Sequence, residues 1–203
     1  MAGPTIDFWQ ARFEAGQTPW ERDTASPQLG KWLAAGEIRP GEDVVVPGCG
    51  GGWEVAALAA HGVRVRGLDY APAALARAAD RLERQGLQAP LEQADVLQWQ
   101  PAAAVDAVYE QTCLCALHPD HWTRYADQLH AWLRPGGRLF ALFMQMRRDS
   151  AAQGIVEGPP YHCDINAMRA LFPAGRWKWP KPPFAAVMHS NGAFELAMVL
   201  ERR

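Results

Sequence analysis

Hydrophobic residues along the chain follow two patterns in turn, one typical of strands and the other of helices. Runs rich in β-branched residues predict strands, and each is followed by a stretch with the period of an amphipathic helix. The strands predicted before the C-terminal region cover residues 43–46, 63–69, 91–96, 104–110 and 138–143. The predicted helices cover residues 6–14, 26–36, 54–61, 72–85 and 121–133. This alternation is typical of a parallel sheet with helices on both faces.

The pattern changes near the C-terminus, where two apolar runs follow each other without a helix. Residues 185–189 and 194–200 flank Ser190-Asn191-Gly192, and Asn-Gly between apolar runs is a strong hairpin signal. We therefore expect an α/β fold with a doubly wound, mostly parallel seven-stranded sheet and a C-terminal antiparallel hairpin, a Rossmann-like architecture. At 203 residues the chain is expected to be a single domain, 1–203.

The loop after the first predicted strand is rich in glycine. Residues 48–52 read Gly-Cys-Gly-Gly-Gly between the strand and a helix. Glycines allow close backbone approach to a ligand at the carboxyl edge of the sheet, where the amides at a helix start point outward. We therefore expect Gly48, Cys49 and Gly50 to contact a cofactor.

Two cofactors suit such a loop, and Trp53 favours one of them. A dinucleotide site of the form G-x-G-x-x-G needs a third glycine where this chain has Trp53, so a nicotinamide-dependent oxidoreductase is the weaker alternative. S-adenosyl-L-methionine carries no phosphate and needs polar partners instead.

Acidic residues at two strand ends could be these partners. Asp69 ends the second strand, where it can accept hydrogen bonds from ribose hydroxyls. Asp95 and Val96 end the third, where they can meet adenine. Either acid could instead be a solvated loop residue, and Asp69 could also cap the next helix.

The glycine loop and the second strand resemble a known family. Residues 44–52, Val-Val-Val-Pro-Gly-Cys-Gly-Gly-Gly, and 65–75, Val-Arg-Gly-Leu-Asp-Tyr-Ala-Pro-Ala-Ala-Leu, are similar to the first two motifs of class I S-adenosylmethionine-dependent methyltransferases. More narrowly, the chain resembles the thiopurine S-methyltransferase group and its thiol and halide methyltransferase-like branch. The segments that carry this likeness are Phe8-Trp9, residues 16–20, residues 46–50, Cys115-Ala116-Leu117 and Gly158-Pro159-Pro160-Tyr161. The resemblance implies methyl transfer to a small soft nucleophile: a thiol, a thiopurine or a halide.

The resemblance also implies roles for individual residues. Residues 1–30 would form a helical, aromatic lid over the cofactor. Cofactor contacts are implied for Trp9, Trp20, Tyr70, Glu110 and Gln111, and we expect acceptor contacts from Pro160 and Tyr161. Three places depart from the family pattern: Phe13 stands where tryptophan is frequent, Glu110-Gln111 replaces aspartate followed by tyrosine or arginine, and Glu157 replaces a glycine.

Composition narrows the class of partner. The net charge of −2 argues against nucleic acid, which requires clustered Lys and Arg. The chain has no apolar run long enough for a membrane span and no signal-peptide pattern at its N-terminus, so we expect a cytoplasmic protein. We also expect a monomer. The four cysteines fit neither a metal site nor a disulfide framework and are expected to be reduced. No spacing assigns a general base, and a binding module without turnover stays open.

Overall fold

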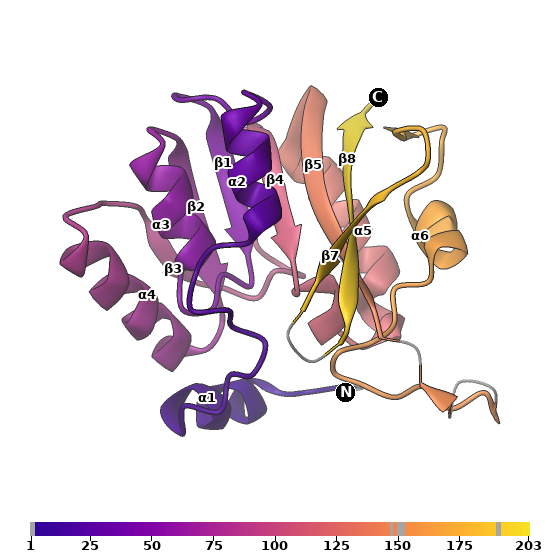
Figure 1. The fold of residues 1–203 in the computed structure, drawn as a ribbon, viewed down its shortest axis with the longest axis horizontal. Coiled ribbons are helices and arrows are strands. Elements are labelled where there is room, and N and C mark those ends of the chain that lie inside the picture. The colour runs from indigo at the N-terminus through magenta and orange to yellow at the C-terminus, as the bar shows by residue number, and fades with distance from the viewer. Residues whose placement is uncertain (1–2, 147, 150–152, 190–191) are drawn as a thin grey trace.

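The computed structural model describes residues 3–146, 148–149, 153–189 and 192–203. Figure 1 shows a single twisted sheet with helices on both of its faces. The α-helices are α1 (Ile6–Glu14), α2 (Pro27–Ala34), α3 (Trp53–Ala60), α4 (Pro72–Arg84), α5 (Trp122–Trp132) and α6 (Ile165–Leu171). The strands are β1 (Asp43–Pro47), β2 (Arg64–Asp69), β3 (Leu91–Gln93), β4 (Val105–Gln111), β5 (Leu133–Gln145), β6 (Trp177–Lys178), β7 (Ala185–Met188) and β8 (Phe194–Arg202). Two 3-10 turns, η1 (Leu114–Ala116) and η2 (Pro119–His121), precede α5.

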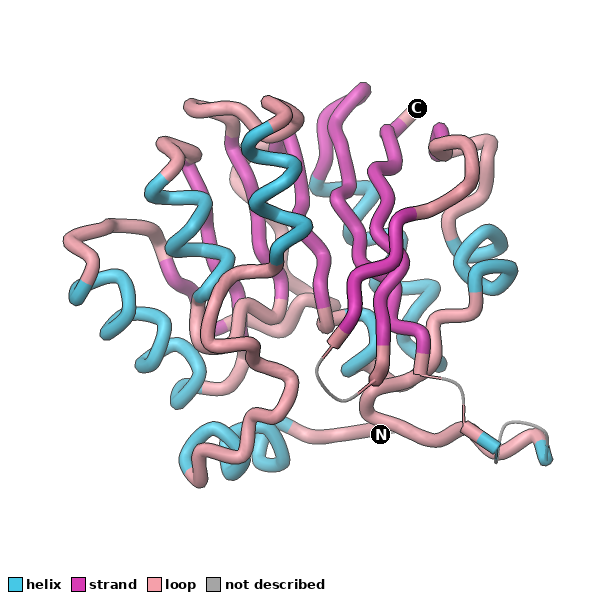
Figure 2. The backbone as a smooth tube through the Cα atoms, viewed as in Figure 1, coloured by secondary structure: helices cyan, strands magenta, loops and turns pink. Residues whose placement is uncertain are grey.

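The strand order is β3-β2-β1-β4-β5-β8-β6, and β7 also pairs with β8. Strands β1 to β5 are parallel, whereas β8 runs antiparallel to β5 and to β7. This confirms the predicted doubly wound sheet and its C-terminal hairpin, which Figure 2 shows in magenta. Ser190 and Asn191 of the predicted turn lie outside the described residues.

The sheet has eight strands rather than seven because a short one was missed. β6 and β7 pair with opposite ends of β8, at Trp177↔Arg202 and at Met188↔Phe194, so the two share one edge of the sheet. β6 is only two residues long and lies close to prolines, which leaves no period-2 pattern to detect.

Two other boundaries differ from the expected ones. β3 ends at Gln93, so Asp95 and Val96 lie in the turn that follows the strand. β5 already begins at Leu133 rather than at residue 138, and residues 134–137 form an irregularity inside it. The pairing with β4 jumps there from Val105↔Leu133 to Ala107↔Arg138.

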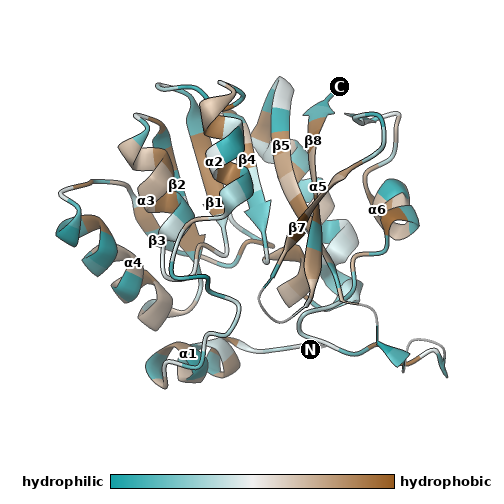
Figure 3. Cartoon of the chain, viewed as in Figure 1, coloured by the Kyte–Doolittle hydropathy of each residue, from teal (hydrophilic) through white to brown (hydrophobic). Residues whose placement is uncertain are grey.

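Two apolar layers hold the sheet between its helices. α2 and α3 pack on one face, where the Trp32 ring lies 6.1 Å from the Tyr109 ring and 5.1 Å from the Phe140 ring. α5 and α6 pack on the other face, around the fully buried Trp132 and Trp177. Figure 3 shows apolar colour along most of the central strands. Each large side chain buried in this way contributes about 1.5–3 kcal/mol.

The parallel strands all end at the same edge of the sheet, and this edge carries the loops that matter for function. Figure 1 shows α1 below this edge, near the start of α4. Phe13 of α1 is buried against Ala71 and Ala74 at the start of α4, which attaches the helix to the sheet edge.

Candidate active site

The glycine loop joins β1 to α3 in the conformation that its residues require. Gly48, Gly50 and Gly52 have φ of 59°, 52° and 76°, a region that side-chain-bearing residues rarely adopt. A Cβ on Gly52 would lie 2.6 Å from the Cβ of Ala78 in α4, and one on Gly48 would lie 3.0 Å from the Cβ of Cys113. Glycine is therefore needed for the turn itself and for the close packing around it.

Asp69 connects the end of β2 to this loop. Its carboxylate accepts hydrogen bonds from the backbone N–H of Gly50 at 3.0 Å and of Ala71 at 2.9 Å, and the residue is buried. Burial raises the pKa of Asp69, and the backbone donors counteract that effect in part. The geometry places Asp69 directly beside the glycine loop, as the sequence predicts. The N-cap position of α4 is Ala71, so Asp69 does not cap that helix but fixes the backbone just before it.

The N-terminal segment closes over the same loop with aromatic rings. The Trp20 ring makes edge contacts with the Trp9 ring at 5.4 Å and the Phe13 ring at 5.9 Å. The next residue, Glu21, accepts a hydrogen bond from the backbone N–H of Gly51 at 3.0 Å. The segment is therefore fixed to the glycine loop by a polar bond as well as by apolar packing.

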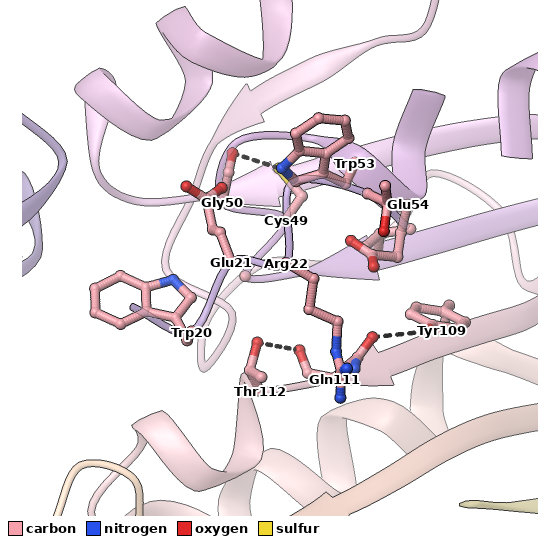
Figure 4. A pocket seen from close by; sticks show the side chains of 13 residues that line it. Trp20, Glu21, Arg22, Cys49, Gly50, Trp53, Glu54, Tyr109, Gln111 and Thr112 are labelled. Atoms are coloured by element: carbon pink, nitrogen blue, oxygen red, sulfur yellow. Dashed lines mark hydrogen bonds between the residues drawn. The ribbon is translucent and has the colours of Figure 1, made fainter. Parts of the chain in front are cut away.

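A cavity of about 50 Å³ lies between this segment and the ends of β1 and β4. Figure 4 shows its lining side chains. The expected cofactor residues that line it are Trp20, Gly48, Cys49, Gly50 and Gln111. Glu21, Arg22 and Glu54 also line it, and they were not among the residues expected from the sequence. Glu21 and Arg22 directly follow Trp20, so their place in the aromatic segment was the signal that could have identified them.

A buried polar network forms the wall of the cavity at the end of β4. Gln111 donates to the carboxylate of Glu195 in β8 at 2.8 Å and accepts from the Tyr109 hydroxyl at 2.8 Å. Glu195 is fully buried, and its Oε2 lies 3.0 Å from Nε2 of His189. Arg22 approaches the same carboxylate from the N-terminal segment, with Nη2 at 4.0 Å. Side chains from three distant parts of the sequence thus meet at one point.

Comparison with known proteins decides the family. A model of the thiopurine S-methyltransferase family matches residues 5–195. The chain belongs to the thiopurine S-methyltransferase family. Thiocyanate methyltransferase 1 of Arabidopsis thaliana is 30% identical over 173 residues, covering 82% of this chain and 72% of that protein. Thiopurine S-methyltransferase of Pseudomonas paraeruginosa is 30% identical over 190 residues, covering 85% and 83%.

Solved structures agree on the fold. The 1,6-didemethyltoxoflavin-N1-methyltransferase of Burkholderia thailandensis, crystallised with S-adenosylhomocysteine, superposes with a TM-score of 0.76 at 21% identity, covering 97% of this chain and 86% of that one. The resemblance seen in the sequence is confirmed, and the protein is an S-adenosylmethionine-dependent methyltransferase. The oxidoreductase alternative is not favoured.

The site fits the cofactor of the thiopurine S-methyltransferase family. The glycine loop brings backbone close to the cavity, and Asp69 gives a carboxylate beside it. Asp95 lies in the turn after β3, where it accepts from the backbone N–H of Leu97 at 2.9 Å, and Val96 is buried next to it. Tyr70 follows Asp69 and donates to the carbonyl of Pro4 at 3.3 Å. Burial raises the pKa of Tyr70 to about 12.

Glu110 sits apart from the residues that line the cavity. It is fully buried and accepts a hydrogen bond from the backbone N–H of Leu114 at 2.6 Å, which holds the 3-10 turn after β4. Burial raises the pKa of Glu110 to about 8, and the nearby charge of Glu195 adds to the shift. Its cofactor contact stays a prediction, whereas its neighbour Gln111 faces the cavity.

Tyr161 lies in the loop that follows β5 and contacts the region of the two 3-10 turns, η1 and η2. Its backbone N–H donates to the carbonyl of Cys115 at 2.7 Å, and its ring packs edge-on against His118 at 5.4 Å. Tyr161 is 5% exposed, while Pro160 is partly exposed beside it. Their role in binding the acceptor stays a prediction.

The cysteines near these loops are free and buried. Burial raises the pKa values of Cys113, Cys115 and Cys163, which keeps their thiols protonated and poorly nucleophilic. Within the described residues, no group of three or more His, Cys, Asp or Glu side chains is arranged to hold a metal ion. No helix in the described part of the chain is long and apolar enough to cross a membrane.

Proposed function

We propose that this methyltransferase transfers the methyl group of S-adenosylmethionine to the sulfur of a small thiol. The match of residues 5–195 to the thiopurine S-methyltransferase family carries the proposal. Relatives named as thiocyanate and thiopurine methyltransferases favour a sulfur acceptor, but they differ in its size and charge. A halide remains the second candidate, because it is also a small soft nucleophile.

The cofactor supplies an electrophilic methyl group on a sulfonium, so the protein mainly has to bind, align and exclude water. In this proposal the glycine loop holds the amino-acid end of the cofactor, Asp69 binds its ribose, and Asp95, Val96 and Tyr70 complete its adenine side. Trp9 and Trp20, within the lid of residues 1–30, cover it. Aromatic faces near a sulfonium add about 0.5–2 kcal/mol of cation–π stabilisation.

The acceptor would approach from the side of Pro160 and Tyr161. The buried thiols and histidine packing there support a largely apolar wall, in which a soft nucleophile loses its hydration shell. The contacts of Glu110 and Gln111 with the cofactor, the cytoplasmic location and the monomeric state belong to the same proposal.

The test is an acceptor panel with methyl-labelled S-adenosylmethionine. Thiophenol, 2-mercaptoethanol, 6-mercaptopurine, thiocyanate and iodide are compared by kcat/KM, with product formation followed by the label. We expect a neutral thiol to be methylated fastest. A higher kcat/KM for iodide than for every thiol would show that the acceptor is a halide. Calorimetric binding of S-adenosylhomocysteine without turnover of any acceptor would indicate a non-catalytic binding module.

A further inference from the structure

Arg22 has an unusual environment for a cationic side chain. Its Nη1 donates to the backbone carbonyl of Met188 at 2.9 Å, which fixes the direction of the guanidinium. Its Nε and Nη2 are buried from solvent and have no hydrogen-bond partner among the described residues. Buried donors are nearly always paired, so two unpaired donors on one charged group indicate a missing acceptor.

The two unpaired atoms form the edge by which arginine binds a carboxylate. Arg64 in the same protein uses its Nε and Nη2 to donate to both oxygens of Asp43, at 2.8 and 2.7 Å. This parallel geometry is the strongest pairing that a guanidinium makes with a carboxylate. The free edge of Arg22 therefore has the shape and charge to bind one carboxylate group.

Glu195 is the nearest carboxylate, but it does not take this place. Its Oε2 lies 4.0 Å from Nη2 of Arg22, too far for a hydrogen bond, and it already accepts a hydrogen bond from Gln111 and lies 3.0 Å from Nε2 of His189. Its Oε1 is also buried without a partner. Glu195 thus compensates the charge of Arg22 from a distance and leaves its donor edge unused.

The position of Arg22 identifies the carboxylate. Arg22 lines the cavity together with Gly48, Gly50 and Gln111, and Figure 4 shows it extending from the aromatic segment toward Gln111. The only part of S-adenosylmethionine with a carboxylate is its amino-acid end. We propose that Arg22 binds the α-carboxylate of S-adenosylmethionine through its Nε–Nη2 edge, with Glu195 and the Met188 carbonyl as positioning groups.

This inference rests on the proposed function, because it assigns a residue to that cofactor. It also gives the N-terminal segment a second task. Trp20 contributes aromatic surface to the cavity. Arg22, by binding the carboxylate of S-adenosylmethionine, would hold the N-terminal segment against the cofactor. A ligand without that carboxylate would close the segment less firmly.

The experiment compares two ligands that differ in the amino-acid end. S-adenosylhomocysteine carries the carboxylate, and 5′-methylthioadenosine lacks the whole amino-acid end. Their dissociation constants are measured by calorimetry for the wild type, Arg22→Gln, Arg22→Lys and the control Arg12→Gln, an arginine of the same segment that packs on Phe8. Thermal unfolding of each variant confirms that it is folded.

We expect Arg22→Gln to weaken S-adenosylhomocysteine binding about 10- to 100-fold, because a charge-assisted bidentate pair is lost. Binding of 5′-methylthioadenosine should stay within about twofold, since it cannot make the contact. Arg22→Lys should lie between the two, because it keeps the charge without the planar fork. Arg12→Gln should resemble the wild type for both ligands.

Three results would overturn the assignment. Unchanged S-adenosylhomocysteine binding in Arg22→Gln removes the contact. An equal loss of affinity for both ligands would show that Arg22 only stabilises the position of the N-terminal segment. In steady-state kinetics of Arg22→Gln, the KM could rise for a carboxylate-bearing thiol such as thioglycolate but not for 2-mercaptoethanol. If cofactor affinity is unchanged as well, Arg22 binds a carboxylate of the acceptor and not that of the cofactor. Failure of the wild type to bind S-adenosylhomocysteine would instead refute the proposed function.

Discussion

The two halves of the functional edge of the sheet differ in how their polar groups are held. At β1 and β2, the Asp69 carboxylate accepts hydrogen bonds from the backbone N–H groups of Gly50 and Ala71, in segments that are adjacent in the fold. At β4 and β8, Gln111 meets Glu195 from 84 positions away, and buried donors and acceptors remain unpaired. The first half, the glycine loop with Asp69, is held by backbone geometry, and we call it the cradle. The second half is a network of side chains whose unpaired buried atoms can still bind a ligand.

The largest expected effect tests the cradle. Gly52→Ala should destabilise the protein by about 2–5 kcal/mol, because the residue has φ of 76° and its Cβ would meet Ala78. The matched control is Gly30→Ala within α2, where nothing lies within 4 Å of the added Cβ, and it should stabilise by up to about 1 kcal/mol. Urea unfolding of both variants measures the difference, and equal stabilities would show that the loop is not rigid.

The second effect tests, through pH, the buried carboxyl group of Glu110, which neighbours this network on β4. Glu110 has its pKa raised to about 8, so the folded state holds a proton that the unfolded chain releases above about pH 4.5. Its contribution to stability is therefore complete at low pH and is lost between about pH 4.5 and 8, on the order of 3 kcal/mol. Glu110→Gln keeps an acceptor for Leu114 and should flatten this loss. Denaturant unfolding at pH 5 and pH 8 provides the measurement, and parallel pH dependence in both proteins would contradict it.

The third effect tests the cradle by removing the negative charge of Asp69. Asp69→Asn should weaken S-adenosylhomocysteine binding by about 1–3 kcal/mol, through loss of charge-assisted hydrogen bonds to the loop and to the ribose. Asp43→Asn, at the opposite end of the same sheet in an exposed pair with Arg64, is the control and should leave binding unchanged. Calorimetry on both variants decides, and a folded Asp69→Asn with wild-type affinity would exclude Asp69 from the site.

The smallest effect concerns the acceptor side. Tyr161→Phe keeps the buried ring that packs on His118, so stability should change by less than about 0.5 kcal/mol. We expect a change of a few-fold in the KM or kcat for the thiol and none in the affinity for S-adenosylhomocysteine. Steady-state kinetics with the best acceptor of the panel, set beside calorimetry, makes the comparison. A shift in cofactor affinity alone would place Tyr161 in the cofactor site instead.

Much of the cofactor side could be predicted because its signals are local. A β-branched run, a glycine loop and an acid at the end of the next strand each occupy a few consecutive residues, and the parallel topology brings them to one edge. The part that was missed has no such signature. β6 is too short for a period, and Glu195 reads in the sequence as an ordinary polar residue within β8.

The sequence by itself thus determined the alternation of strands and helices, the glycine loop with Asp69, and the donor class. Only the tertiary structure decided that Arg22, Gln111 and Glu195 meet, and that a guanidinium edge remains unpaired where they do. The physical reason is that hydrophobic period and backbone torsion act between neighbours in the chain. Pairing of buried charges depends instead on which distant segments the closed core brings within a few ångströms of each other.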